Sequence, residues 1–228
     1  MTKVKICGIT SMTDASDAAH AGADYLGFIF YPGSPRYIAP ADARDIVWHV
    51  RNHFNEGGVQ FVGVFVDAPV EKMLSIRQEL GLSLIQCHGH ETPDMVNQLQ
   101  SGAFKAIQSQ DLTDSLMQVD LYAKNISHED TAPQLLLDAF HPSKKGGTGL
   151  LADMEIAQAL SLRCRLLLAG GLNPGNVYEI IRRVKPWGVD VSSGVEMNHG
   201  EKVLKGRKDP NKIRAFIQEV KRADDWTG

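Results

Sequence analysis

The sequence has few of the features that mark membrane, secreted or nucleic-acid-binding proteins. No apolar run approaches the roughly 18–20 residues of a membrane span, and the amino terminus lacks a signal-peptide pattern. The formal net charge of −3 gives no overall field that would attract nucleic acid or an acidic membrane. The three cysteines, Cys7, Cys87 and Cys164, cannot all pair with one another. We therefore expect reduced thiols, a cytoplasmic protein, and neither a nucleic-acid nor a membrane partner.

Two further absences concern the chemistry. The segment Cys7-Gly8-Ile9-Thr10, after the first apolar run, has no G-x-G-x-x-G dinucleotide-binding fingerprint. No pair of His, Cys or Asp residues has the spacing of metal ligands, so we expect no metal. His88 stands alone at the end of an apolar run, and a lone histidine is more often a hydrogen-bonded structural residue than a ligand.

Short apolar runs alternate with helical patterns along the chain. Eight of these runs are four to six residues long, and most are bounded by Gly, Pro or Asp, as is typical of buried parallel strands. The predicted strands are Val4–Cys7, Tyr25–Phe30, Phe61–Val66, Ser83–Cys87, Phe104–Ile107, Leu135–Asp138, Arg165–Ala169 and Gly188–Val191. Thr13-Asp14 resembles a helix cap, and proline suits a first helical turn. This predicts the helices Pro40–Trp48, Pro93–Leu99, Pro174–Val184 and a final helix from about Pro210 to Arg222.

Eight strand–helix units in 228 residues predict an α/β fold, a (β/α)₈ TIM barrel, with residues 1–228 as a single domain. The 43% hydrophobic composition is ample for its core. The alternative is an open doubly wound sheet, which the missing glycine fingerprint disfavours. The irregular segment Met197–Lys212 carries Lys202, Lys205, Arg207 and Lys208 among glycines. We expect it to be a solvated surface loop, with a lid as the alternative.

Barrels of this kind carry their chemistry on the loops that follow the strands. Glycine-rich loops follow the sixth, seventh and eighth predicted strands, where backbone N–H groups can approach phosphate oxygens closely. The predicted phosphate-binding residues are Gly147, Gly170, Gly171, Ser192, Ser193 and Gly194. The loops after the third and fourth strands, Val66–Pro69 and His88–Glu91, lack this pattern. We therefore expect a substrate with one phosphate.

Cys7 and Asp138 each end an apolar strand and are the candidate acid–base groups, although a core thiol and a turn-capping carboxylate are the alternatives. A thiol that acts as a base needs a lowered pKa. Lys5 shares the inward face with Cys7, and we expect it to pair with Asp190 and to supply positive potential. A carboxyl group at the mouth of an apolar barrel is placed to act as an acid. Arg36, in a Pro-rich loop, is suited to binding a carboxylate, with a surface arginine as the alternative.

In their order and spacing these motifs resemble the phosphoribosylanthranilate isomerases of tryptophan biosynthesis. The resemblance is carried by Lys5–Gly8, Gly27–Phe30, Ser34–Arg36, Val62–Phe65, Gln86–Gly89, Leu137–Asp138, Gly146–Gly149, Leu168–Leu172 and Val189–Glu196. It implies a (β/α)₈ barrel and a cofactor-independent Amadori rearrangement. That reaction converts N-(5-phosphoribosyl)anthranilate into 1-(2-carboxyphenylamino)-1-deoxyribulose 5-phosphate.

The resemblance also implies a role for each candidate residue. Asp138 is the general acid that protonates the furanose oxygen, and Cys7 is the general base that removes the C2′ proton. Arg36 holds the anthranilate carboxylate, and the loops after the seventh and eighth strands hold the phosphate. From the sequence we expect either a monomer or a homodimer.

The sequence departs from the family pattern at three places. Cys87 replaces the usual leucine, Leu150–Met154 replaces a Phe-Asp-Trp segment, and the connection between Glu196 and Lys208 is longer than usual. One alternative is the related histidine-pathway isomerase, which would need two carboxylates and a second phosphate cradle after strands three and four. Another is a catalytically inactive sugar-phosphate-binding barrel that acts as a sensor or scaffold.

Overall fold

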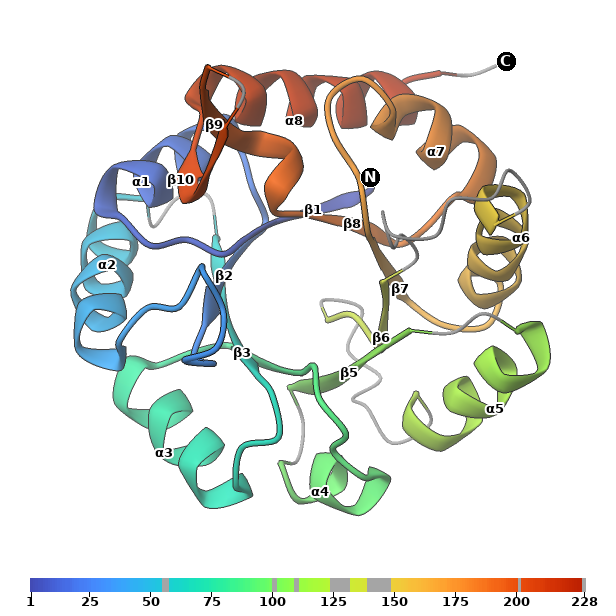
Figure 1. The fold of residues 1–228 in the computed structure, drawn as a ribbon, viewed down its shortest axis with the longest axis horizontal. Helices are drawn as coiled ribbons and strands as arrows, with labels where there is room; N and C mark the ends of the chain where they lie inside the picture. Colours follow the sequence, from blue (N-terminus) through green and yellow to red (C-terminus); the bar gives the residue numbers. More distant parts are fainter. Residues whose placement is uncertain are drawn as a thin grey trace.

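The structure is a computed structural model that describes residues 1–54, 58–99, 102–108, 111–123, 132–138, 149–200 and 202–226, with only the backbone of 149–153. Eight parallel strands pair in sequence order and close into a barrel, β8 against β1 (Figure 1). The barrel strands are β1 (Lys3–Cys7), β2 (Tyr25–Ile29), β3 (Gln60–Phe65), β4 (Leu84–Cys87), β5 (Ala103–Ile107), β6 (Leu135–Asp138), β7 (Leu166–Ala169) and β8 (Gly188–Val191). All eight strand predictions are confirmed to within one residue at either end. The open-sheet alternative is wrong, because this sheet has no free edge.

Helices surround the barrel on its outside (Figure 1). They are α1 (Met12–Ala21), α2 (Pro40–His53), α3 (Val70–Leu80), α4 (Pro93–Gln98), α5 (Leu112–Tyr122), α6 (Gly149–Ser161), α7 (Val177–Val184) and α8 (Pro210–Asp224). Proline opens α2, α4 and α8, as predicted. Helix α2 continues five residues past the predicted end at Trp48, because Val50 extends its buried face.

Two predicted helix starts are wrong. The cap of α1 is Ser11, whose side chain accepts a hydrogen bond from the Asp14 N–H at 3.2 Å, so Thr13 and Asp14 lie inside the first turn. Pro174 precedes α7 rather than opening it. The Asn173 side chain accepts from the Gly175 N–H at 2.8 Å and holds these residues in a turn.

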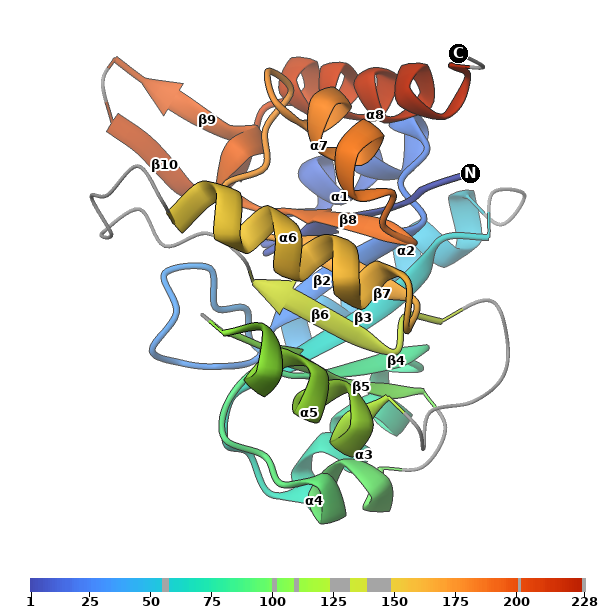
Figure 2. The same cartoon turned by 90° about the vertical axis from the view of Figure 1, so that its right-hand side faces the viewer.

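The segment Met197–Lys212 is not irregular. It contains an antiparallel hairpin of β9 (Glu196–His199) and β10 (Lys202–Lys208), followed by the first turn of α8. In Figure 2 the hairpin projects at the end of the barrel toward which β6 points. The tip is exposed, but Glu196 and Lys208 at its base are buried. The predicted solvated loop is therefore wrong at the base of this segment, where Lys208 is buried beside Glu196.

Alternate residues of each strand point into the barrel, which is closed at one end and open at the other. Large buried side chains fill the closed end, among them Tyr25, Val62, Phe104, Leu136 and Leu167. The last inward positions of the strands are smaller or polar, and they leave a cavity where the strands end. No helix among the described residues is both long enough and apolar enough to cross a membrane.

Candidate active site

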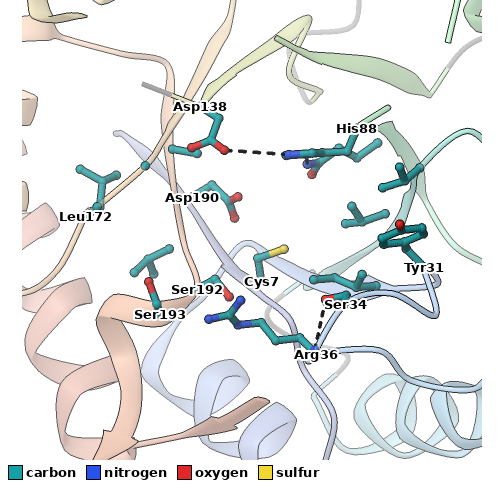
Figure 3. A pocket seen from close by; sticks show the side chains of 18 residues that line it. Cys7, Tyr31, Ser34, Arg36, His88, Asp138, Leu172, Asp190, Ser192 and Ser193 are labelled. Carbon is teal, nitrogen blue, oxygen red and sulfur yellow. Dashed lines mark hydrogen bonds and ion pairs between the residues drawn. The ribbon is translucent and has the colours of Figure 1, made fainter. Parts of the chain in front are cut away.

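A cavity of about 520 Å³ opens at the carboxyl-terminal ends of the strands (Figure 3). Most of the predicted site residues line it, namely Cys7, Arg36, Asp138, Gly170, Gly171, Ser192 and Ser193. Gly194 lies outside the lining, and Gly147 lies outside the described residues. The departure at Leu150–Met154 falls in the first two turns of α6.

Cys7 stands above a buried ion pair. Lys5 pairs with Asp190 in the register between β1 and β8, which brings its Nζ to 3.0 Å from the Asp190 carboxylate. Both side chains are almost inaccessible, with 1% of Lys5 and 9% of Asp190 exposed. The predicted Lys5–Asp190 pair is therefore confirmed, and strand alternation places Cys7 directly beyond it.

The thiol does not have the lowered pKa that a base was expected to have. Burial raises the pKa of Cys7, and the nearby Lys5 ammonium lowers it by less. Burial alone would lower the pKa of Lys5, but Asp190 and the thiol hold that pKa above its ordinary value. Cys7 is therefore a neutral thiol beside a charged ammonium, so further positive charge would favour its thiolate.

Two glycines make room for these side chains. A Cβ atom on Gly27, which pairs with Cys7 across β1 and β2, would stand 2.9 Å from the Cys7 sulfur. Gly8 has φ +73°, and a Cβ atom there would stand 2.7 Å from Cδ of Arg36. Side chains at these positions would displace the thiol or the arginine.

Asp138 and His88 face one another across the cavity from Cys7 (Figure 3). The His88 Nε2 atom lies 4.0 Å from the Asp138 carboxylate, and the Gln86 amide holds the other ring nitrogen at 2.8 Å. Burial lowers the pKa of His88, so the ring is neutral near pH 7 despite the carboxylate. His88 lines the active-site cavity, which its place in the sequence alone did not indicate.

Arg36 is held from behind by Glu196. Its Nε and Nη2 atoms donate to the two carboxylate oxygens at 2.6 and 2.9 Å. The Gly206 N–H on the hairpin donates to the same carboxylate at 2.8 Å. Hydrogen bonds from Arg36 lower the pKa of Glu196 although burial opposes them, and the Glu196 bonds in turn raise the pKa of Arg36. One fifth of the Arg36 side chain stays exposed to the cavity.

The loops after β7 and β8 meet at the side of the cavity away from His88. Gly170 and Gly171 have φ +96° and +63°, which turns the chain sharply after β7. A Cβ atom on Gly194 would stand 1.9 Å from the Leu172 carbonyl oxygen, so this glycine lets the two loops touch. Below them the Lys208 ammonium donates to the Ser192 carbonyl and hydroxyl at 3.0 and 3.3 Å. Sequence reasoning missed Lys208, because its strand was expected to be a loop.

These groups define a class of enzyme. A thiol and a carboxyl group face one cavity, with an arginine and a glycine–serine loop pair beside them, at the strand ends of a (β/α)₈ barrel. That arrangement is typical of acid–base chemistry on a small phosphorylated substrate. Among the described residues, no three His, Cys, Asp or Glu side chains are grouped as metal ligands.

Comparison with known proteins gives the family. Residues 4–219 match the family model described as N-(5'phosphoribosyl)anthranilate (PRA) isomerase. The isomerase of Trichlorobacter lovleyi is 43% identical over 98% of this chain and 100% of its own length. That of Geobacter sp. strain M21 is 41% identical over 97% and 99%. The chain belongs to the N-(5'-phosphoribosyl)anthranilate isomerase family.

Solved structures agree with this assignment. The crystal structure of the isomerase from Thermotoga maritima has a TM-score of 0.79 and 36% identity, covering 97% of this chain and 100% of that one. A phosphoribosylanthranilate isomerase in complex with reduced 1-(o-carboxyphenylamino)-1-deoxyribulose 5-phosphate has a TM-score of 0.78 and 35% identity, with the same coverage. The expected (β/α)₈ barrel and family are confirmed.

Proposed function

We propose that this chain converts N-(5-phosphoribosyl)anthranilate into 1-(2-carboxyphenylamino)-1-deoxyribulose 5-phosphate with Cys7 as base and Asp138 as acid. The chain is an isomerase by its family, and it acts in tryptophan biosynthesis. The observation that carries the residue assignment is that the two groups face one cavity between a guanidinium and the β7–β8 loops. This separation of a thiol, a carboxyl group, a guanidinium and two glycine–serine loops around one cavity supports the proposal.

Asp138 gives its proton to the ring oxygen of the sugar. The C1′–O4′ bond then breaks, and the nitrogen lone pair forms a protonated Schiff base at C1′. The half-buried position of Asp138 at the end of β6 supports this role, and so does His88 at 4.0 Å. A neutral imidazole at that distance can orient the carboxyl group through one bridging water.

Cys7 first releases its own proton to solvent and then takes the C2′ proton as a thiolate. The resulting enolamine tautomerises to the ketone, with a proton delivered to C1′. Burial keeps the thiol protonated, and the positive Schiff base would supply the charge that favours its thiolate. Lys5 adds to this potential from below. The order of steps, ring opening before proton abstraction, therefore suits the electrostatics of the site.

Arg36 and the two loops hold the ends of the substrate. Glu196 uses Nε and Nη2 of Arg36, so Nη1 is the group left to bind the anthranilate carboxylate. The phosphate would lie against the N–H groups of Gly170, Gly171, Ser192, Ser193 and Gly194. Lys208 beneath Ser192 would add positive charge there. Gly147 is proposed for the same role from its sequence motif alone.

The inactive-barrel alternative is not favoured, because the curated relatives over the full chain are isomerases. The test is turnover of freshly prepared N-(5-phosphoribosyl)anthranilate by the purified chain, with substrate and product separated by chromatography. Rapid formation of the aminoketose is expected. Tight substrate binding without product would overturn the proposed function and restore the sensor or scaffold.

We further propose a cytoplasmic location, since all three cysteines are free thiols.

We also propose that the chain works as a monomer or a homodimer. A Thermotoga maritima structure, 35% identical with a TM-score of 0.76, is of monomers generated from a dimeric isomerase of this family. Light scattering of the purified chain distinguishes the two states.

A further inference from the structure

A second group of anion-binding donors lies across the barrel mouth from the phosphate loops, and the chain fills it with its own carboxylate. The side chain of Glu91 is completely buried. Its Oε1 accepts from the Asp67 N–H at 2.9 Å, and its Oε2 accepts from the Gly89 N–H at 2.9 Å. The Lys105 ammonium lies 3.2 Å from Oε2. Two backbone N–H groups and an ammonium are ligands suited to phosphate.

The loops after β3 and β4 are shaped to aim these donors inward. Asp67 has φ +50°, a left-handed conformation that is uncommon for a residue other than glycine. A Cβ atom on Gly89 would stand 2.4 Å from Oδ1 of Asp67, so only glycine permits the loops to meet this closely. The Asp67 carboxylate also accepts from the His90 N–H and fixes the turn. The cradle is thus a formed structure.

The Glu91 cradle lies at the same end of the barrel as the proposed phosphate site, but on the opposite side. In an eight-stranded barrel β3 lies opposite β7, and β4 lies opposite β8. Each pair of loops has a buried lysine beneath it: Lys208 donates to the Ser192 carbonyl at 3.0 Å, and Lys105 donates to the Gly89 carbonyl at 2.6 Å. The difference is Glu91, which occupies the place of an anion on the β3–β4 side.

We propose that Glu91 is a specificity-determining residue whose carboxylate occupies a second phosphate cradle and so restricts the enzyme to substrates with one phosphate. This inference rests on the proposed function, whose substrate has a single phosphate. A second cavity of about 490 Å³ borders Glu91 and Lys105, and it shares Val66 and His88 with the active-site cavity. If the Glu91 carboxylate were removed, the space it occupies would therefore connect to the active-site cavity.

The test is to remove the carboxylate and count bound phosphate. Glu91→Ala is expected to bind two inorganic phosphate ions per chain by equilibrium dialysis, whereas the wild type binds one. Asp94→Ala, which removes an exposed carboxylate three residues away, is the matched control and is expected to bind one. A folded Glu91→Ala protein that binds only one phosphate would overturn the proposal.

Loss of a buried carboxylate also destabilises the fold, so a second readout is needed. Phosphate is expected to raise the melting temperature of Glu91→Ala more than that of the wild type, relative to chloride at equal ionic strength. If the alanine variant does not fold, Glu91→Ser is measured in the same two ways, and an equal phosphate effect in variant and wild type refutes the cradle. A wild type that binds no phosphate or shows no turnover would instead be a failure of the proposed function.

Discussion

Replacement of Lys5 by methionine tests the electrostatic account of Cys7. Methionine has a similar length and fits the buried position, but it removes the ammonium that pairs with Asp190 at 3.0 Å. The same ammonium lies within hydrogen-bonding reach of the thiol and lowers its pKa. The change therefore removes an attraction to the thiolate and leaves the repulsion by Asp190 unopposed. Both effects raise the pKa of Cys7.

The size of the change in the Cys7 pKa follows from the separation between the Lys5 ammonium and the Cys7 thiolate. Two unit charges about 4 Å apart interact by about 4 kcal/mol at an effective dielectric constant of about 20. That energy corresponds to roughly three pH units at about 1.36 kcal/mol each. Relaxation and water entry reduce this value, so we expect the pKa of Cys7 to rise in Lys5→Met and its reaction with an alkylating agent to slow by about 10- to 10³-fold.

The assay is the rate of alkylation of Cys7 by iodoacetamide as a function of pH, read by mass spectrometry of the Cys7 peptide. Below its pKa a thiol reacts in proportion to its thiolate fraction, so each unit of increase slows the reaction about tenfold. Reading one peptide separates Cys7 from Cys87 and Cys164, whose pKa values burial raises to about 12 and about 11.

An unpaired buried Asp190 costs about 3–5 kcal/mol of stability. The double variant Lys5→Met/Asp190→Asn removes both charges and is the control for that cost. Its Cys7 pKa is expected to lie between those of the wild type and the single variant, because Lys5 affects the thiol more than Asp190 does. A folded Lys5→Met protein with an unchanged Cys7 titration would refute the reasoning.

Two further predictions concern neighbouring residues. Gly27→Ala places a methyl group 2.9 Å from the Cys7 sulfur. We therefore expect kcat/KM to fall by about 10²-fold. A kcat/KM near that of the wild type would show that the position of the thiol is not critical. Glu196 has a pKa below its ordinary 4.5, so it stabilises the fold above that pH and the contribution is lost as pH falls through the folded pKa. In urea titrations on both sides of pH 4.5, Glu196→Gln should therefore lose less stability on acidification than the wild type, and equal losses would contradict this.

The barrel could be predicted from the sequence because its strands are local patterns. Leu135–Asp138 and Gly188–Val191 are apolar runs with clear ends, and their prediction needed no knowledge of their partners. Strand alternation also placed Lys5 beside Asp190 once the barrel closed. The candidate residues Cys7 and Asp138 could be proposed for the same reason, since each ends such a run.

The remaining features depend on contacts between distant residues. The bond between Arg36 and Glu196 joins residues 160 positions apart, and no local pattern indicates it. Lys208 lies on a strand that exists only through pairing with β9, so it was read as part of a basic loop. The neutral state of His88 likewise follows from burial in the assembled barrel.

The most direct test of the account is the rate of Cys7→Ser and Asp138→Asn at saturating N-(5-phosphoribosyl)anthranilate, compared with the wild type. Each acid–base group is expected to contribute about 10²–10⁴-fold, or roughly 3–5 kcal/mol of transition-state stabilisation. Both variants should keep the wild-type circular dichroism spectrum while losing at least that factor of about 10². A folded variant at either position that kept more than about a tenth of the wild-type rate would contradict the role assigned to that residue.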